Sequence, residues 1–84
     1  MLNGLNYDER RMLRLILATL LWDQALSPGA KWVMVETETL ESKEKSALRS
    51  LVKQGYVERV RSNGMVLLSF TDKGYVAARE AERV

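Results

Sequence analysis

The sequence contains neither cysteine nor histidine, and no apolar run is long enough to cross a bilayer. Without cysteine there can be no disulfide scaffold and no nucleophilic thiol, and without either residue the thiolate and imidazole metal ligands are missing. The longest apolar run, residues 15–22, even contains Thr19, whereas a membrane-spanning helix needs about 20 apolar residues. No signal peptide is evident. These absences favour a small cytoplasmic protein that uses no metal or other cofactor.

The length and composition predict one folded domain, with its positive charge concentrated in the second half. The chain has 84 residues, of which 46% are hydrophobic and 29% charged. Residues 1–41 carry four basic and six acidic side chains, a net charge of −2, and residues 42–84 carry nine and five, a net charge of +4. Within residues 42–61 the count is six basic to two acidic. A local excess of this kind favours a polyanionic partner.

A first helix is predicted from Glu9 to about Ala25, capped by Asn6 or Asp8, because no glycine or proline interrupts this stretch. One face of it carries apolar residues at helical spacing, namely Met12, Leu13, Ile16, Leu17, Leu20 and Leu21. Three further apolar residues, Leu15, Trp22 and Leu26, fall on roughly the opposite side. A chain this short has little protein to cover both faces, so we expect a homodimer interface at these three residues. The alternative is that Trp22 and Leu26 pack under the following loop.

The middle of the chain predicts a short strand and then a basic helix. KWVMVET (residues 31–37) alternates imperfectly, as a short strand does, and the acidic segment that follows has room for one helical turn near Leu40, capped by Thr37 or Thr39. Ser42 is expected to cap a helix over residues 42–54 that ends at Gly55. Its predicted inward face is Ala47, Leu48, Leu51 and Val52, and its outward face is Lys45, Ser46, Arg49, Ser50 and Lys53.

The last third predicts a β-hairpin followed by a helix. Residues 56–60 and 65–70 have strand patterns, and Asn63-Gly64 between them is typical of a tight hairpin turn, because both residues tolerate positive φ. Thr71 is expected to cap a helix that continues to about Glu82. Tyr75, Val76 and Ala78 are expected to pack inward.

Two strings, ALRSLVKQGYVERV and LLSFTDKGYVAAREA, give the chain a family resemblance that covers roughly residues 42–80. Their order and spacing resemble winged-helix regulators of the multiple-antibiotic-resistance type. The resemblance implies an α+β fold, a winged helix-turn-helix with a three-helix core, a two-stranded β wing and a C-terminal helix. It also implies a DNA-binding protein, not an enzyme, that takes part in transcription regulation.

In that family the helix equivalent to residues 42–54 enters the major groove of double-stranded DNA, so the resemblance implies which residues here contact it. Lys45, Ser46, Arg49 and Ser50 would face base edges or nearby phosphates, and arginine is the commonest specific reader of guanine. Phosphate contacts are expected from Lys43, Lys53, Arg59 and Arg61. Asn63 at the wing tip is expected to meet the minor groove or the backbone.

Two other classes of function remain open. The first is a protein-interaction module without DNA binding, which the apolar first helix and the acidic segment Glu36–Glu41 would suit, with Trp22 and Trp32 as anchors. The second is an enzyme, which the sequence disfavours. Glu36 and Glu38 have no accompanying metal-ligand motif, and the five glycines form no phosphate-binding loop. Nothing specifies a small-molecule effector.

Overall fold

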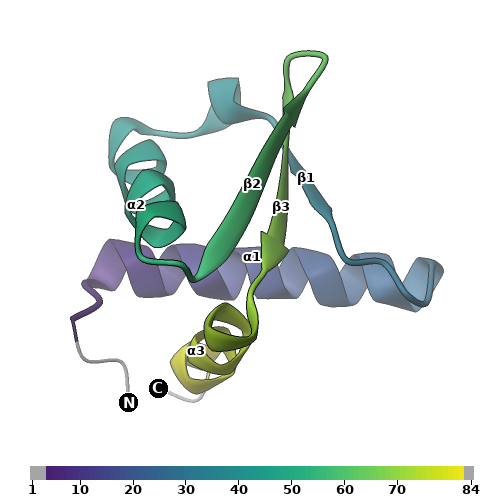
Figure 1. The fold of residues 1–84 in the computed structure, drawn as a ribbon, viewed down its shortest axis with the longest axis horizontal. Helices are drawn as coiled ribbons and strands as arrows, with labels where there is room; N and C mark the ends of the chain where they lie inside the picture. Colours follow the sequence, from purple (N-terminus) through teal and green to yellow (C-terminus); the bar gives the residue numbers. More distant parts are fainter. Residues whose placement is uncertain (1–3, 83–84) are drawn as a thin grey trace.

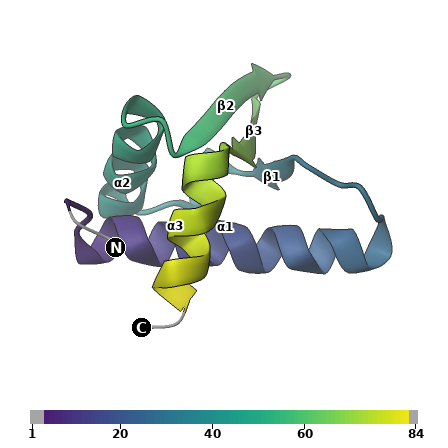
Figure 2. The same ribbon diagram turned by 60° about the horizontal axis from the view of Figure 1, so that its bottom comes forward.

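The computed structural model describes residues 4–82 and has an α+β architecture. In chain order the elements are α1 (Tyr7–Leu26), β1 (Val33–Val35), a short 3-10 turn (Thr37–Thr39), α2 (Ser42–Lys53), β2 (Val57–Ser62), β3 (Met65–Phe70) and α3 (Asp72–Glu82). The strands form one antiparallel sheet in the order β1-β3-β2. α1 runs along the base of the molecule, α2 and the sheet lie on one side of it, and α3 crosses it (Figures 1 and 2). This layout is compatible with a winged helix.

α1 begins two residues earlier than predicted because a complete capping box forms at its N-terminus. Asn6 Oδ1 accepts a hydrogen bond from the backbone N–H of Glu9, and Glu9 Oε1 accepts one from the backbone N–H of Asn6, both at 2.8 Å. Two of the otherwise unpaired N-terminal N–H groups are satisfied in this way. Of the two predicted caps, Asn6 is therefore confirmed.

The core lies where α1 meets α2, α3 and the sheet. Its largest fully buried side chains come from α1, from α2 and from each of the three strands: Leu13, Leu17, Leu51, Val33, Val57 and Leu68. Each contributes roughly 1.5–3 kcal/mol by burial. The predicted inner face of α1 is confirmed except at Leu21, which is 43% exposed. Because helical residues advance by about 100°, Leu21 turns away from the core that Leu20 enters.

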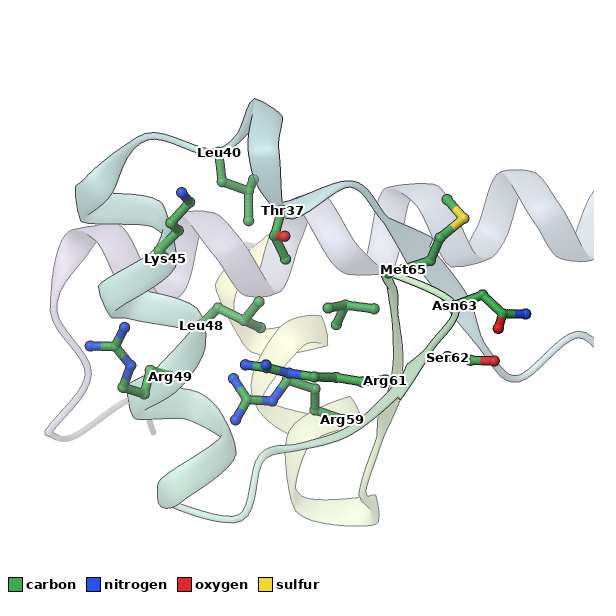
Figure 3. Close-up of a pocket in the computed structure, with 12 residues that line it drawn as sticks. Thr37, Leu40, Lys45, Leu48, Arg49, Arg59, Arg61, Ser62, Asn63 and Met65 are labelled. Carbon is green, nitrogen blue, oxygen red and sulfur yellow. The ribbon is translucent and has the colours of Figure 1, made fainter.

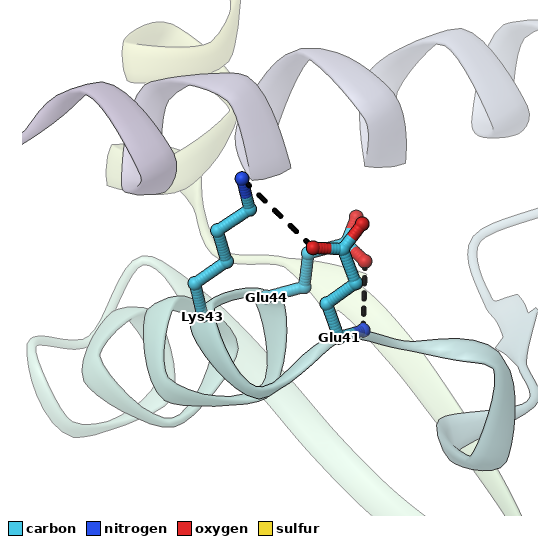
Figure 4. A network of polar contacts seen from close by, with 3 residues as sticks. All are labelled: Glu41, Lys43 and Glu44. Carbon is cyan, nitrogen blue, oxygen red and sulfur yellow. Dashed lines mark hydrogen bonds and ion pairs between the residues drawn. The ribbon is translucent and has the colours of Figure 1, made fainter.

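The start of α2 corrects the predicted cap. Ser42 is the first helical residue, and Glu41 occupies the N-cap position. The backbone N–H of Glu41 donates to Glu44 Oε1 at 2.9 Å, and Lys43 Nζ lies 3.9 Å from Glu41 Oε2 (Figure 4). Carboxylates at this end also interact favourably with the positive end of the helix dipole, so the acidic segment serves to begin α2. The predicted inward face is confirmed for Ala47, Leu48 and Leu51, which are buried.

The hairpin forms as its turn sequence predicts. β2 and β3 pair from Val57 opposite Phe70 to Ser62 opposite Met65, which leaves Asn63 and Gly64 as a two-residue loop. Their φ angles are 50° and 79°. Two consecutive positive values match the turn whose twist suits a hairpin, and only residues such as Asn and Gly adopt them at low cost.

α3 packs through small residues, not through the larger ones that hydrophobicity favours. Its buried positions are Gly74, Ala77, Ala78 and Ala81, whereas Tyr75 and Val76 are 39% and 57% exposed. The inward prediction is thus confirmed for Ala78 and wrong for Tyr75 and Val76. A face of glycine and alanine lets α3 approach α1 and the backbone of Tyr56 closely, and larger side chains on that face would hold the helix away.

Candidate nucleic-acid interface

A cleft of about 490 Å³ lies between α2 and the β2–β3 hairpin. Four cationic side chains line it: Lys45 and Arg49 from α2, and Arg59 and Arg61 from β2. None of the described residues that line it carries a carboxylate, and within residues 4–82 none of the four cations forms an ion pair. The cleft therefore concentrates positive charge that no side chain of the described chain neutralises.

The two arginines of β2 face the cleft because side chains alternate along a strand. Val57 points into the core and is 2% exposed. Arg59 and Arg61 share its face of the strand, but they lie farther along the hairpin, where the core has ended. In Figure 3 both side chains extend from β2 toward α2. Their placement follows from the register of a single buried valine.

The α2 side of the cleft has a charged rim and an apolar floor. Lys45 and Arg49 are four residues apart and so lie on one face of the helix. Between them Leu48 is buried and points into the same space (Figure 3). Leu40 and Val66 also line the cleft. An apolar floor lowers the local dielectric constant, which strengthens the attraction of the rim for an anion.

The other predicted DNA-binding residues lie around the cleft, with one exception. Asn63 at the hairpin tip lines the cleft, together with its neighbours Ser62 and Gly64, which were not among the predicted residues. Lys43, Ser46 and Lys53 are exposed on α2 but do not line the cleft. The structure thus brings together five of the predicted residues, Lys45, Arg49, Arg59, Arg61 and Asn63. It leaves Lys43, Ser46 and Lys53 on other exposed parts of α2.

Ser50 is the exception, and its outward placement is corrected. Its hydroxyl donates to Glu9 Oε2 at 2.5 Å, and Gln54 Nε2 donates to the same oxygen at 2.9 Å. Glu9 is only 4% exposed. Ser50 is thereby engaged in fixing the C-terminal half of α2 to the first turn of α1, which leaves its hydroxyl turned away from the exposed face.

Glu9 is the residue that sequence reasoning missed. The sequence predicts only that Glu9 begins the first helix, but its two carboxylate oxygens serve two elements, since Oε1 caps α1 and Oε2 holds α2. A buried carboxylate is stable only when its oxygens accept hydrogen bonds, as they do here. The signal available in the sequence was the capping-box spacing from Asn6, which predicts one of these bonds and says nothing of α2.

The junction between α2 and β2 is fixed by the start of α3. Thr71 Oγ1 donates to the carbonyl oxygen of Gly55 at 2.7 Å and accepts the backbone N–H of Gly74 at 3.0 Å, which confirms Thr71 as a helix cap. Lys73 Nζ donates to the Gln54 carbonyl at 3.0 Å and lies 4.2 Å from the centre of the Tyr56 ring. These contacts, which we call the Thr71 corner, hold residues 54–56, so they set the angle at which β2 leaves α2 and the width of the cleft.

The residues predicted for a dimer interface are on the surface. Leu15, Trp22 and Leu26 are 49%, 70% and 75% exposed, so Trp22 and Leu26 do not pack under the loop that follows α1. Trp32 is 41% exposed. No group of three or more carboxylates that could hold a metal occurs in residues 4–82, and over the same range no helix is long and apolar enough to cross a membrane.

No family model, curated protein or solved structure matches this chain.

Proposed function

We propose that the protein binds double-stranded DNA as a winged helix, with α2 in the major groove and the β2–β3 hairpin along the neighbouring backbone. The observation that carries this proposal is the convergence of Lys45, Arg49, Arg59 and Arg61 on one cleft without a carboxylate among them. Phosphate groups supply most of the free energy of non-specific DNA binding, and basic side chains that are not already paired are free to neutralise them.

Two features favour a duplex over a single strand. The exposed face of α2 is a helix surface of 12 residues beside a two-stranded ribbon, and both shapes fit the major groove, which is about 12 Å wide. Proteins that bind single strands stack bases on aromatic side chains. Among the described residues that line the cleft, none is aromatic.

The positions of the side chains divide them into two roles. Arg49, Lys45 and Ser46 lie on the part of α2 that would meet base edges, and the paired donors of Arg49 suit the O6 and N7 atoms of guanine. Arg59 and Arg61 on the strand, with Lys53 on the helix, would contact phosphates, which fix register without reading sequence. Lys43 already pairs with Glu41 and is left out of this set. Asn63 at the hairpin tip would meet the sugar-phosphate chain.

A regulator of transcription is the role that this arrangement supports best. When a few side chains of one helix contact base edges, the protein prefers particular DNA sequences. A small binding domain with such a preference acts by occupying its preferred site on DNA. The order β1-β3-β2 and the position of the hairpin beside α2 support the winged-helix assignment. The abbreviated turn at Thr37–Thr39 takes the place that a full helix occupies in the family the sequence resembles.

The proposal is tested by fluorescence anisotropy with a labelled duplex of random sequence. The test variant is Arg59→Ala/Arg61→Ala. The matched control is Lys31→Ala/Arg79→Ala, which removes two exposed cations outside the cleft. Both changes lower the formal net charge from +2 to 0, so any difference between the two variants reflects position and not total charge.

We expect the cleft variant to bind about tenfold to a hundredfold more weakly than the parent. It loses the contacts of two arginines, a hydrogen bond to a charged group contributes about 1.5–3 kcal/mol, and hydrogen bonds to water recover part of each loss. The control should stay within about threefold of the parent, since exposed charges far from the contact act only through a screened field. Equal losses in the two variants would contradict the cleft. A parent protein that binds no DNA at low salt would assign the domain to protein interaction instead.

A further inference from the structure

A second group of cations lies on the first two turns of α1, outside the cleft. Tyr7, Arg10 and Arg14 line a small pocket of about 130 Å³ together with Ala81 of α3. Arg11 is exposed on the same turns. Because a helix turns by about 100° per residue, the tyrosine and the three arginines fall within about 100° of its circumference. We call Tyr7, Arg10, Arg11 and Arg14 the α1 cationic face.

The arginines of this face are not neutralised by the rest of the described chain. Within residues 4–82 none of the three forms an ion pair, and none of the described residues that line the pocket carries a carboxylate. Glu9 is near them in sequence, but it is buried and accepts hydrogen bonds from Ser50 and Gln54. Three arginines against Asp8 therefore leave a net charge of +2 on the outer side of these two turns.

This arrangement is unfavourable for the helix alone. Arg10 and Arg14 are four residues apart, and like charges at that spacing repel each other. Arg10 also lies at the end of the first turn, where the positive end of the helix dipole disfavours a cation. An anion held between the two guanidinium groups would remove the repulsion. The fold gives no other reason for placing these charges together.

The donors and the size of the pocket suit a phosphate group. The planar guanidinium groups of Arg10 and Arg14 match pairs of phosphate oxygens, and the hydroxyl of Tyr7 is a further donor. Sites that enclose an organic ligand measure roughly 300–1,000 Å³, so this smaller pocket admits one anionic group. Arg11 lies outside the pocket, and the three arginines extend over about 6 Å of the helix axis. A DNA backbone, which presents its charges in series, can engage all three.

We propose that the α1 cationic face binds the phosphate backbone of a second DNA segment, so that one protein molecule holds two segments at once. Glu9 faces α2, and Arg11, two residues later, lies on nearly the opposite side of the helix. α2 and the sheet lie on one side of α1 (Figures 1 and 2), so a straight duplex in the cleft does not reach this face. The inference rests on the proposed function for the segment held by the cleft, whereas the α1 cationic face can bind phosphates without it.

The first test observes the face directly in the Arg59→Ala/Arg61→Ala variant, in which the cleft is weakened. When a short duplex of random sequence is added, the Nε–H signals of Arg10 and Arg14 should shift in nitrogen–proton NMR spectra. The signal of Arg79, which lines neither the pocket nor the cleft, should not shift. A parallel titration uses inorganic phosphate. Shifts with inorganic phosphate but not with the duplex would make this a small-anion site, and shifts with neither would remove the site, so either result would overturn the proposal.

The second test measures bridging with beads that carry one duplex and a labelled second duplex in solution. The parent protein should retain the labelled duplex on the beads. Arg10→Gln/Arg14→Gln should retain about tenfold less, because two charge-assisted contacts are lost, while its affinity for one duplex in fluorescence anisotropy stays within about threefold of the parent. The matched control is Lys31→Gln/Arg79→Gln, which removes the same charge at two exposed residues outside both surfaces and should bridge as the parent does.

Two results of the bridging experiment would overturn the proposal. Undiminished bridging by Arg10→Gln/Arg14→Gln would show that two protein molecules, and not two faces of one, hold the duplexes. Equal losses of bridging and of single-duplex affinity would make this face part of one continuous DNA site. A failure of the proposed function is a different result, since it would leave the anisotropy of Arg59→Ala/Arg61→Ala equal to that of the parent.

Discussion

Replacing Gly74 by alanine should destabilise the protein through a single steric contact. A Cβ atom at position 74 would lie 1.7 Å from the carbonyl oxygen of Tyr56 and 2.7 Å from its carbonyl carbon. Contacts of a real Cβ stay above 3.0 Å, so α3 would have to retreat by about 1.3 Å, the difference between 3.0 and 1.7 Å. The obstructing atoms belong to the backbone and cannot rotate away.

The magnitude follows from three terms. Overpacking against backbone is at the upper end of the usual range, about 3 kcal/mol. The retreat also weakens the hydrogen bond from the Thr71 N–H to the Tyr56 carbonyl, 3.2 Å in the parent, at a cost of about 1 kcal/mol. Alanine returns about 1 kcal/mol through its better helix propensity. The net loss in the free energy of unfolding is thus about 3 kcal/mol, which corresponds to a fall in Tm of about 12–24 °C for a domain of this size.

Urea denaturation and thermal melting followed by circular dichroism measure this loss. The control is Val76→Ala, which also places an alanine in α3 but at a side chain that is 57% exposed, and it should change stability by less than about 1 kcal/mol. If Gly74→Ala were as stable as the parent, or more stable because helix propensity dominated, the close approach of α3 to Tyr56 and the Thr71 corner built on it would be refuted.

Three further substitutions test the site and its support. Arg49→Ala should cost about 1–3 kcal/mol of specific binding and relax the preference at one base pair, as measured by selection from a randomised duplex pool; unchanged selection would remove Arg49 from base reading. Lys53→Ala should weaken binding to all sequences alike and make the slope of log affinity against log salt shallower by about one unit, and a change in sequence preference would contradict a phosphate role. Glu9→Ala should lower the free energy of unfolding by about 2–3 kcal/mol, since Ser50 and Gln54 lose their acceptor, whereas a stability within 0.5 kcal/mol of the parent (about the scatter expected of a surface site) would refute the Glu9 contact to α2.

Local features of the fold could be predicted from the sequence because local physics decides them. Asn63-Gly64 adopts the positive φ angles that its composition favours, and the caps at Asn6 and Thr71 form with residues three positions away. The inner face of α1 follows helical periodicity. In each case the deciding contacts lie within a few residues along the chain.

Features that depend on distant contacts could not be predicted. Ser50 has the pattern of an exposed helix position, and only the approach of Glu9, 41 residues away, turns it inward. Tyr75 and Val76 are the more hydrophobic side chains of α3, but the carbonyl of Tyr56 admits only a glycine at position 74, and this fixes which face of the helix is buried. The charge excess of residues 42–61 was visible in the sequence, whereas the meeting of Arg49 with Arg59 and Arg61 in one cleft depends on the angle between α2 and β2.

The most direct measurement of the central claim is the affinity of the parent protein for duplex DNA of random sequence across a salt series. If Lys53, Arg59 and Arg61 each neutralise one phosphate, log affinity should fall with log salt concentration with a slope of about −2.7, which is −0.9 for each contact. Affinity should then drop about 40-fold when the salt concentration is raised fourfold. Binding with a slope near zero, or no binding at low salt, would contradict the assignment of this cleft to DNA.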